Sequence, residues 1–147
     1  MRWLLLLLLL SGVATCSQGS TISWPDALAG IAAGEHAWLN KTPELASAAD
    51  VQQAQALESA LSSALSTNTE GTLKALTVLD AGEWPHFVGS DIVCMGPVNK
   101  QAADIETFYQ QTRLALLSTE KGAVCLWILE ATYEEWKAAH RRKVDGF

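Results

Sequence analysis

The chain has 147 residues, of which 49% are hydrophobic and 18% charged, and its formal net charge is −6. This length suits one domain with a sizeable buried core. The composition excludes a collagen, a disordered tail and a disulfide-dense mini-protein. No apolar run reaches the roughly 20 residues that a helix needs to cross a bilayer.

The N-terminus has the pattern of a secretory signal peptide over residues 1–15. Arg2 supplies the positive charge, Leu4–Leu10 is an unbroken apolar run, and small residues follow it. Because this run is too short to span a bilayer, we expect an export signal rather than a membrane anchor.

Residues 13–16 (VATC) resemble a bacterial lipobox, the motif whose cysteine is lipidated after cleavage and becomes the new N-terminus. The resemblance implies a lipid anchor on Cys16, and Ser17 after it implies sorting to the outer membrane. Acyl chains hold stably, since each buried methylene contributes about 0.8 kcal/mol. Cleavage a few residues later is the alternative. Residues 16–22 then form a polar leash, and residues 23–147 a single helical domain of a periplasmic protein.

The three cysteines also suit an oxidising compartment. With Cys16 lipidated or removed, Cys94 and Cys125 remain as one pair, and export favours a disulfide between them. Such a bond would restrict the unfolded chain by about 3–4 kcal/mol. The alternative is two separate buried thiols.

The pattern of apolar residues predicts an all-α fold of about five helices, in a small bundle or in stacked helical pairs. The first helix begins with the cap, proline and acid of residues 23–26 and continues at helical spacing to Leu39, with Gly34 as a break or kink. Pro43 and the alanine-rich stretch after it predict a connection or a short helical turn.

Later segments follow the same periodicity. Residues 50–65 open with a capping signature and place their apolar side chains on one face, which predicts a helix. The sequence TNTE at 67–70 interrupts the chain, and a shorter helix follows to Leu79. Two more helices are expected at 105–116 and 125–136. Trp127 lies off the apolar stripe of the last one, where we expect it to contact another helix.

One long irregular segment is expected at residues 80–101, because glycine and proline interrupt it too often for a helix. Loops of this length are often functional. A disulfide at Cys94 would pin the loop to the last helix. Residues 87–88 or 92–93 are expected as a brief strand, although no partner strand is evident.

Three short features occur together along the chain, and their residues are Trp24, Trp38-Leu39 and Val93-Cys94-Met95-Gly96-Pro97. With them the chain is similar to uncharacterised helical periplasmic proteins of Gram-negative bacteria, over most of the mature length. The resemblance implies a helical fold and a periplasmic location, and it brings no activity with it.

The best candidate site lies on the long loop, at Glu83, Trp84, His86 and Phe87. An acid and a histidine three residues apart could share a proton, and Trp84 could stack on a sugar or an apolar ligand. The alternative is that Trp84 and Phe87 pack into the helical core while Glu83 and His86 face water. Asp80 with Glu83 is a further carboxylate pair, as a hydrolase would need.

Motifs for catalysis and cofactors are absent from the sequence: it contains no GxSxG, HExxH, P-loop, GxGxxG or EF-hand loop. No cofactor is therefore expected. The histidines His36, His86 and His140 stand far apart and form no i,i+4 ligand pair, so we expect no metal site.

Charge is unevenly distributed, with Lys137, Arg141, Arg142 and Lys143 crowded near the C-terminus of an otherwise acidic chain. Nucleic acid needs an extended basic surface, so no nucleic-acid partner is expected. The cluster suits the negative end of a helix, or alternatively anionic lipid headgroups. The acidic body favours a cationic protein partner.

Together these features favour an exported, non-catalytic interaction module of inhibitor or immunity type, with an acidic surface and with residues 80–97 as the contact surface. The first alternative is a periplasmic protein that binds a small ligand. The second is a hydrolase that uses Glu83 with His86 or Asp80. A purely structural lipoprotein of the cell envelope is a further alternative.

Overall fold

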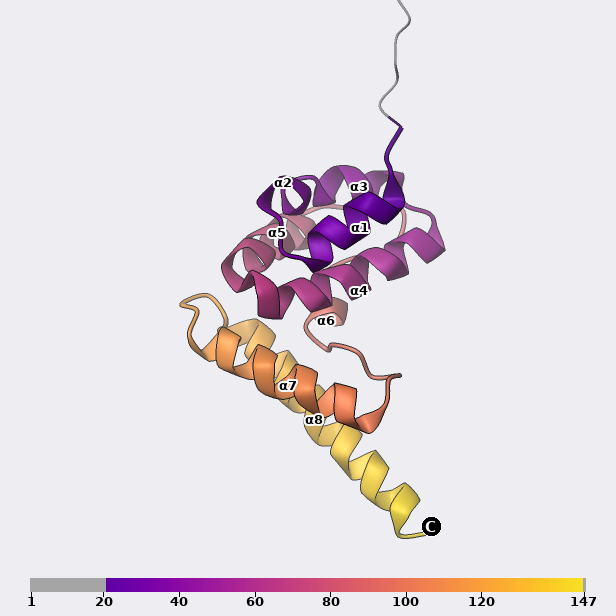
Figure 1. Cartoon of the computed structure of the whole chain (residues 1–147), viewed down its shortest axis with the longest axis vertical. Helices are drawn as coiled ribbons and strands as arrows, with labels where there is room; N and C mark the ends of the chain where they lie inside the picture. Colours follow the sequence, from indigo (N-terminus) through magenta and orange to yellow (C-terminus); the bar gives the residue numbers. More distant parts are fainter. Residues whose placement is uncertain (1–20, 147) are drawn as a thin grey trace, which may run out of the picture.

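The computed structural model describes residues 21–146, which form eight α-helices and no strand (Figure 1). The predicted all-α class is confirmed, whereas the expected number of about five helices is too low. The signal peptide at 1–15 and the lipidation of Cys16 lie outside the described residues and stay predictions. Within the described part of the chain, no helix combines the length and the apolar character that crossing a membrane requires.

The first expected helix is two helices, α1 (Trp24–Ala32) and α2 (His36–Leu39). Gly34 lies between them with a φ of +76°, a conformation that residues with a Cβ rarely adopt. A Cβ at this position would also lie 2.7 Å from Cβ of Asn68. The chain therefore breaks completely at Gly34 instead of bending.

The alanine-rich stretch after α2 is a helix of seven residues, α3 (Thr42–Ala48), with Pro43 in its first turn. The sequence predicted either a connection or a short helical turn here, and the helical alternative is closer to the structure. The hydroxyl cap expected at Ser23 is not made. Ser23 Oγ donates instead to Asp26 Oδ2 at 2.7 Å.

The central helix is α4 (Val51–Thr67), which contacts α1, α3, α5, α6 and α7. Its predicted capping signature is confirmed as a capping box: the Gln53 N–H donates to Asp50 Oδ1 at 2.8 Å, and the Asp50 N–H donates to Gln53 Oε1 at 2.9 Å. Asn68 then ends α4 and caps α5 (Thr69–Ala81), because its Oδ1 accepts from a backbone N–H at 3.0 Å.

The segment at 80–101 is irregular over most of its length, as expected, but it contains the short helix α6 (Ser90–Val93). The brief strand expected at residues 92–93 is therefore wrong, and residues 87–88 form none either. The first residue of α6 makes a long-range contact: Asp80 Oδ1 accepts from the Ser90 N–H at 2.8 Å, and Asp80 Oδ2 accepts from the Ser90 hydroxyl at 2.6 Å. These bonds hold the first turn of α6 against the end of α5.

The last two helices, α7 (Ala102–Leu117) and α8 (Ala123–Val144), form a pair that packs beside α4 and α6. The longer α8 carries the C-terminus away from the rest of the molecule (Figure 1). The predicted disulfide is confirmed: Cys94, directly after α6, is bonded to Cys125 in the first turn of α8, with their Cα atoms 5.2 Å apart. The disulfide fastens the α7–α8 pair to the other helices.

One hydrophobic core runs through the molecule and includes the disulfide. Its largest side chains are completely or almost completely buried, and they are Ile31, Leu45, Leu57, Leu61, Leu65, Leu76, Leu79, Leu116 and Leu129. Tyr109 of α7 and Tyr133 of α8 also belong to this core and stack on each other, with ring centroids 3.7 Å apart. Trp127 does not join another helix as expected, because 74% of its surface is exposed.

Candidate functional site

The residues of the predicted loop site have different environments: Trp84 packs against the core, whereas Glu83 and Phe87 are exposed to solvent. Trp84 is half-buried against the core, and its Nε1–H donates to the Leu79 carbonyl at 2.8 Å. Phe87 is 61% exposed. Glu83, Trp84 and Phe87 line one shallow cavity of about 280 Å³, which His86 does not line. The loop therefore gathers three of the four candidate residues, and the indole of Trp84 has a structural partner.

The proposed acid–base pairs on this loop are not formed. Both carboxylate oxygens of Asp80 accept hydrogen bonds from Ser90, so Asp80 holds α6 in place. Among residues 21–146, no hydrogen bond or ion pair joins Glu83 to His86 or to Asp80. Nor does this part of the chain bring three or more histidine, cysteine or acidic side chains together as metal ligands.

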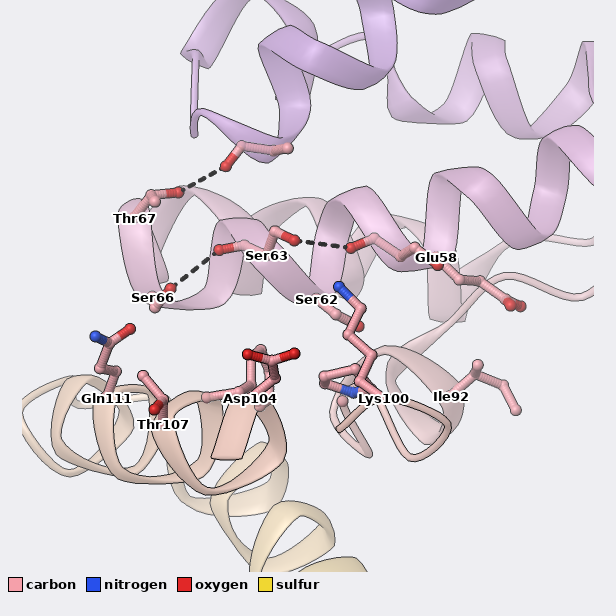
Figure 2. A pocket seen from close by; sticks show the side chains of 15 residues that line it. Glu58, Ser62, Ser63, Ser66, Thr67, Ile92, Lys100, Asp104, Thr107 and Gln111 are labelled. Carbon is pink, nitrogen blue, oxygen red and sulfur yellow. Dashed lines mark hydrogen bonds between the residues drawn. The ribbon is translucent and has the colours of Figure 1, made fainter. Parts of the chain in front are cut away.

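A larger cleft lies between α4 and α7 and has a volume of about 650 Å³ (Figure 2). The sequence did not single it out. One wall is the outward face of α4, the other is the first half of α7, and the end of the 80–101 segment closes one side. The lining residues are Ala32, Glu58, Ser59, Ser62, Ser63, Ser66, Thr67, Ile92, Gly96, Pro97, Lys100, Asp104, Thr107, Phe108 and Gln111.

Small hydroxyl side chains cover the α4 wall, and each donates its hydrogen to a backbone carbonyl. Ser59 donates to Gln55 O at 3.1 Å and Ser63 to Ser59 O at 3.2 Å. Ser62 is buried and donates to the Val93 carbonyl at 2.8 Å, which joins α4 to α6. Two more such bonds, from Ser66 to Ser63 O and from Thr67 to Ala32 O, complete the row at 3.1 Å each (Figure 2).

Three charged residues line the cleft, and they come from three different segments. Glu58 comes from α4, Lys100 from the loop before α7, and Asp104 from the first turn of α7. Figure 2 shows Lys100 and Asp104 directed toward α4 from the facing side. Burial raises the pKa of the Glu58 carboxyl above its ordinary value of 4.5. No ion pair joins Lys100 to either carboxylate within the described range.

The floor of the cleft depends on Gly96, which has a φ of +74°. A Cβ on this residue would overlap the Phe108 ring, so glycine allows the ring to lie against the loop backbone. Because Gly96 follows Cys94 closely, the disulfide also fixes this part of the loop.

A sequence signal for the cleft does exist. Ser59, Ser62, Ser63 and Ser66 recur on one face of a helix that is otherwise rich in alanine and leucine. Serine is a poor choice for an exposed helix face on propensity alone. What the sequence lacks is the position of α7, which turns this face into the wall of a cleft.

The chain matches no protein-family model, and no similarity to a curated protein or to a solved structure was found. The resemblance to helical periplasmic proteins therefore stays a prediction.

Proposed function

We propose that the protein is an exported, non-catalytic interaction module of the cell envelope that binds a protein partner in the α4–α7 cleft. The cleft carries this proposal, because it places hydroxyl, carboxylate and ammonium groups from three segments around one space of about 650 Å³. The proposed contact surface differs from the predicted one, which was the whole 80–97 segment. Only the later part of that segment, at Ile92, Gly96 and Pro97, lines the cleft, and residues 83–87 do not.

A binding role is supported by the state of the hydroxyl groups. A serine nucleophile needs a general base that accepts its proton. Ser59, Ser63 and Ser66 instead donate to carbonyls of their own helix, and Ser62 donates to α6. This arrangement supports a binding role for the α4 wall, because each hydroxyl oxygen keeps lone pairs that can accept from a ligand.

A small-ligand-binding protein is the second candidate, favoured by the volume of the cleft. Sites for small molecules are usually clefts of about 300–1,000 Å³. The two candidates differ in what copurifies: a protein in the first case, and a small molecule in the second.

The test fills the cleft and compares partner capture. Ser63→Trp places an indole between α4 and α7, whereas Gln52→Trp adds the same side chain to an exposed position of α4 outside the cleft. The protein is purified from its own cells together with whatever binds it. We expect a stoichiometric protein partner with the unchanged protein and with Gln52→Trp, and its loss with Ser63→Trp.

Circular dichroism must show equal helix content in both variants. A partner retained by Ser63→Trp would show that binding occurs outside the cleft.

The cellular location is part of the proposal and has its own test. We propose that Cys16 is lipidated and holds the protein at the outer membrane from the periplasmic side. Cys16→Ser should then move the protein from the membrane fraction to the soluble periplasmic fraction. Unchanged fractionation would contradict the anchor and would leave the cleft proposal unaffected.

A further inference from the structure

The α4 wall of the cleft offers hydrogen-bond acceptors and few donors. A hydroxyl group has one hydrogen to donate and two lone pairs that accept. The hydroxyl hydrogens of the α4 residues lining the cleft already donate to backbone carbonyls, in the five bonds described above. Lone pairs are what remains for a ligand. The wall therefore favours a ligand rich in N–H groups.

The charged groups in the cleft also favour a ligand that donates hydrogen bonds. Glu58 and Asp104 bring two carboxylates, which only accept when ionised, and Lys100 is the single cation among the lining residues. Glu58 and Asp104 come from facing walls of the cleft, and burial raises the pKa of the Glu58 carboxyl because it disfavours the charged form. A positive group beside Glu58 would remove this penalty. The net charge of −6 would also attract a cationic partner from a distance.

Apolar side chains in the lining favour a particular kind of cationic ligand. Ile92, Pro97 and Phe108 line the cleft together with Lys100, and the Phe108 ring lies against Gly96. Lysine and arginine side chains bury their methylene stems on apolar surface while the charged tip stays among polar groups. A cation is also attracted to the face of an aromatic ring.

We infer that the cleft binds an extended, lysine- or arginine-rich segment of the protein partner. Glu58 and Asp104 hold its charged tips, the α4 hydroxyls accept from its N–H groups, and Ile92 and Phe108 contact its side-chain stems. This inference rests on the proposed function and specifies the chemistry of the partner.

The test is an NMR titration with short probes of known charge. The protein is labelled with ¹⁵N in its own cells and purified in the form that those cells produce. The probe is acetylated tetralysine amide, with tetraglutamate amide as the opposite charge, chitotriose as a neutral donor-rich ligand and spermidine as a free polyamine. We expect tetralysine to shift the amide resonances of residues 58–67 and 104–111. We expect the other three probes to leave them in place or to bind more weakly.

Matched variants separate the cleft from the overall charge. Glu58→Gln with Asp104→Asn removes two negative charges inside the cleft, and Glu44→Gln with Glu135→Gln removes two exposed charges outside it. Tetralysine affinity should fall about tenfold or more in the first pair and by much less in the second. An equal fall in both pairs would show non-specific attraction and overturn the inference.

The remaining outcomes are also decisive. If tetraglutamate or chitotriose bound in the cleft and tetralysine did not, the inference of a cationic ligand would be wrong, although the cleft would still be a binding site. Spermidine binding as tightly as tetralysine would overturn the peptide segment in favour of a free amine. If no probe shifts the cleft resonances, the inference is wrong. The proposed function is tested separately, by comparing the partner capture of Ser63→Trp with that of Gln52→Trp.

Discussion

Asp80 and Ser90 are ten positions apart, yet the Asp80 carboxylate accepts from both the backbone N–H and the hydroxyl of Ser90, at 2.8 and 2.6 Å. This contact closes the first part of the irregular segment into a loop and starts α6. It also gives Asp80 a structural role, in place of the paired role with Glu83 that a hydrolase would require.

The first prediction follows from this contact. Asp80→Ala removes both hydrogen bonds and should lower the free energy of unfolding by about 1–3 kcal/mol, because bonds to a charged group are the stronger kind. Urea unfolding measures the change. Asp91→Ala, at an exposed position of the same helix, is the control and should have little effect. Equal stability of the two variants would show that the cap contributes nothing.

The second prediction concerns the disulfide between Cys94 and Cys125, both of which are buried. Replacing both by alanine should lower the free energy of unfolding by about 3–4 kcal/mol, since the bond closes a loop of 31 positions in the unfolded chain. Urea unfolding of the oxidised protein and of the double variant gives the difference. A loss below about 1 kcal/mol would contradict the entropic estimate. Partner binding should weaken as well, because the disulfide holds one side of the cleft.

The third prediction concerns the two tyrosines, Tyr109 and Tyr133. The Tyr133 hydroxyl donates to the Glu106 carboxylate, and this bond, followed by burial, raises the pKa of Tyr133 from 10.0 to about 12. Burial raises the pKa of Tyr109 as well. Because the folded pKa of Tyr133 lies above the unfolded one, its stabilising contribution is complete below pH 10 and is lost as the pH rises toward 12.

Ultraviolet absorbance of tyrosinate measures this directly. The folded protein should show little tyrosinate at pH 10, whereas the urea-unfolded chain should titrate there. Glu106→Gln should lower the pKa of Tyr133, and Glu135→Gln is the control. Ordinary titration of both tyrosines in the folded protein would contradict the prediction. On the acid side, hydrogen bonds from Gln110 and Tyr133 lower the pKa of Glu106, so its contribution is lost only as the pH falls below 4.5.

Local signals in the sequence predicted much of the fold. The capping box of Asp50 and Gln53 joins residues three apart, so the sequence alone predicts where α4 begins. The disulfide followed from the number of cysteines and the expected export. Gly34 was recognised as a break or kink, and its positive φ lies in the local turn that ends α1, where the Glu35 N–H donates to the Gly30 carbonyl at 2.9 Å. The sequence did not indicate that Asn68 Nδ2 donates to the Gly34 carbonyl, at 2.8 Å.

The parts that were missed depend on contacts between distant residues. Asp80, at the end of α5, accepts both hydrogen bonds that hold the start of α6, and nothing in the sequence near Ser90 indicates that partner. The cleft depends on where α7 lies beside α4, although the serine face of α4 was visible in the sequence. Trp84 was expected either as a ligand-binding ring or as part of the core, and its bond to the Leu79 carbonyl favours the core.

The last prediction distinguishes the start of the loop from the cleft as the contact surface. Glu83 and Phe87 are exposed, whereas Trp84 supports the core, so the informative variant is Glu83→Ala with Phe87→Ala and with Trp84 kept. Its stability should stay within about 0.5 kcal/mol of the unchanged protein, as is usual for surface positions. Its affinity for the captured partner should also be unchanged, because neither residue lines the α4–α7 cleft. If this variant lost the partner while Ser63→Trp still bound it, the contact surface would lie at residues 83–87 instead.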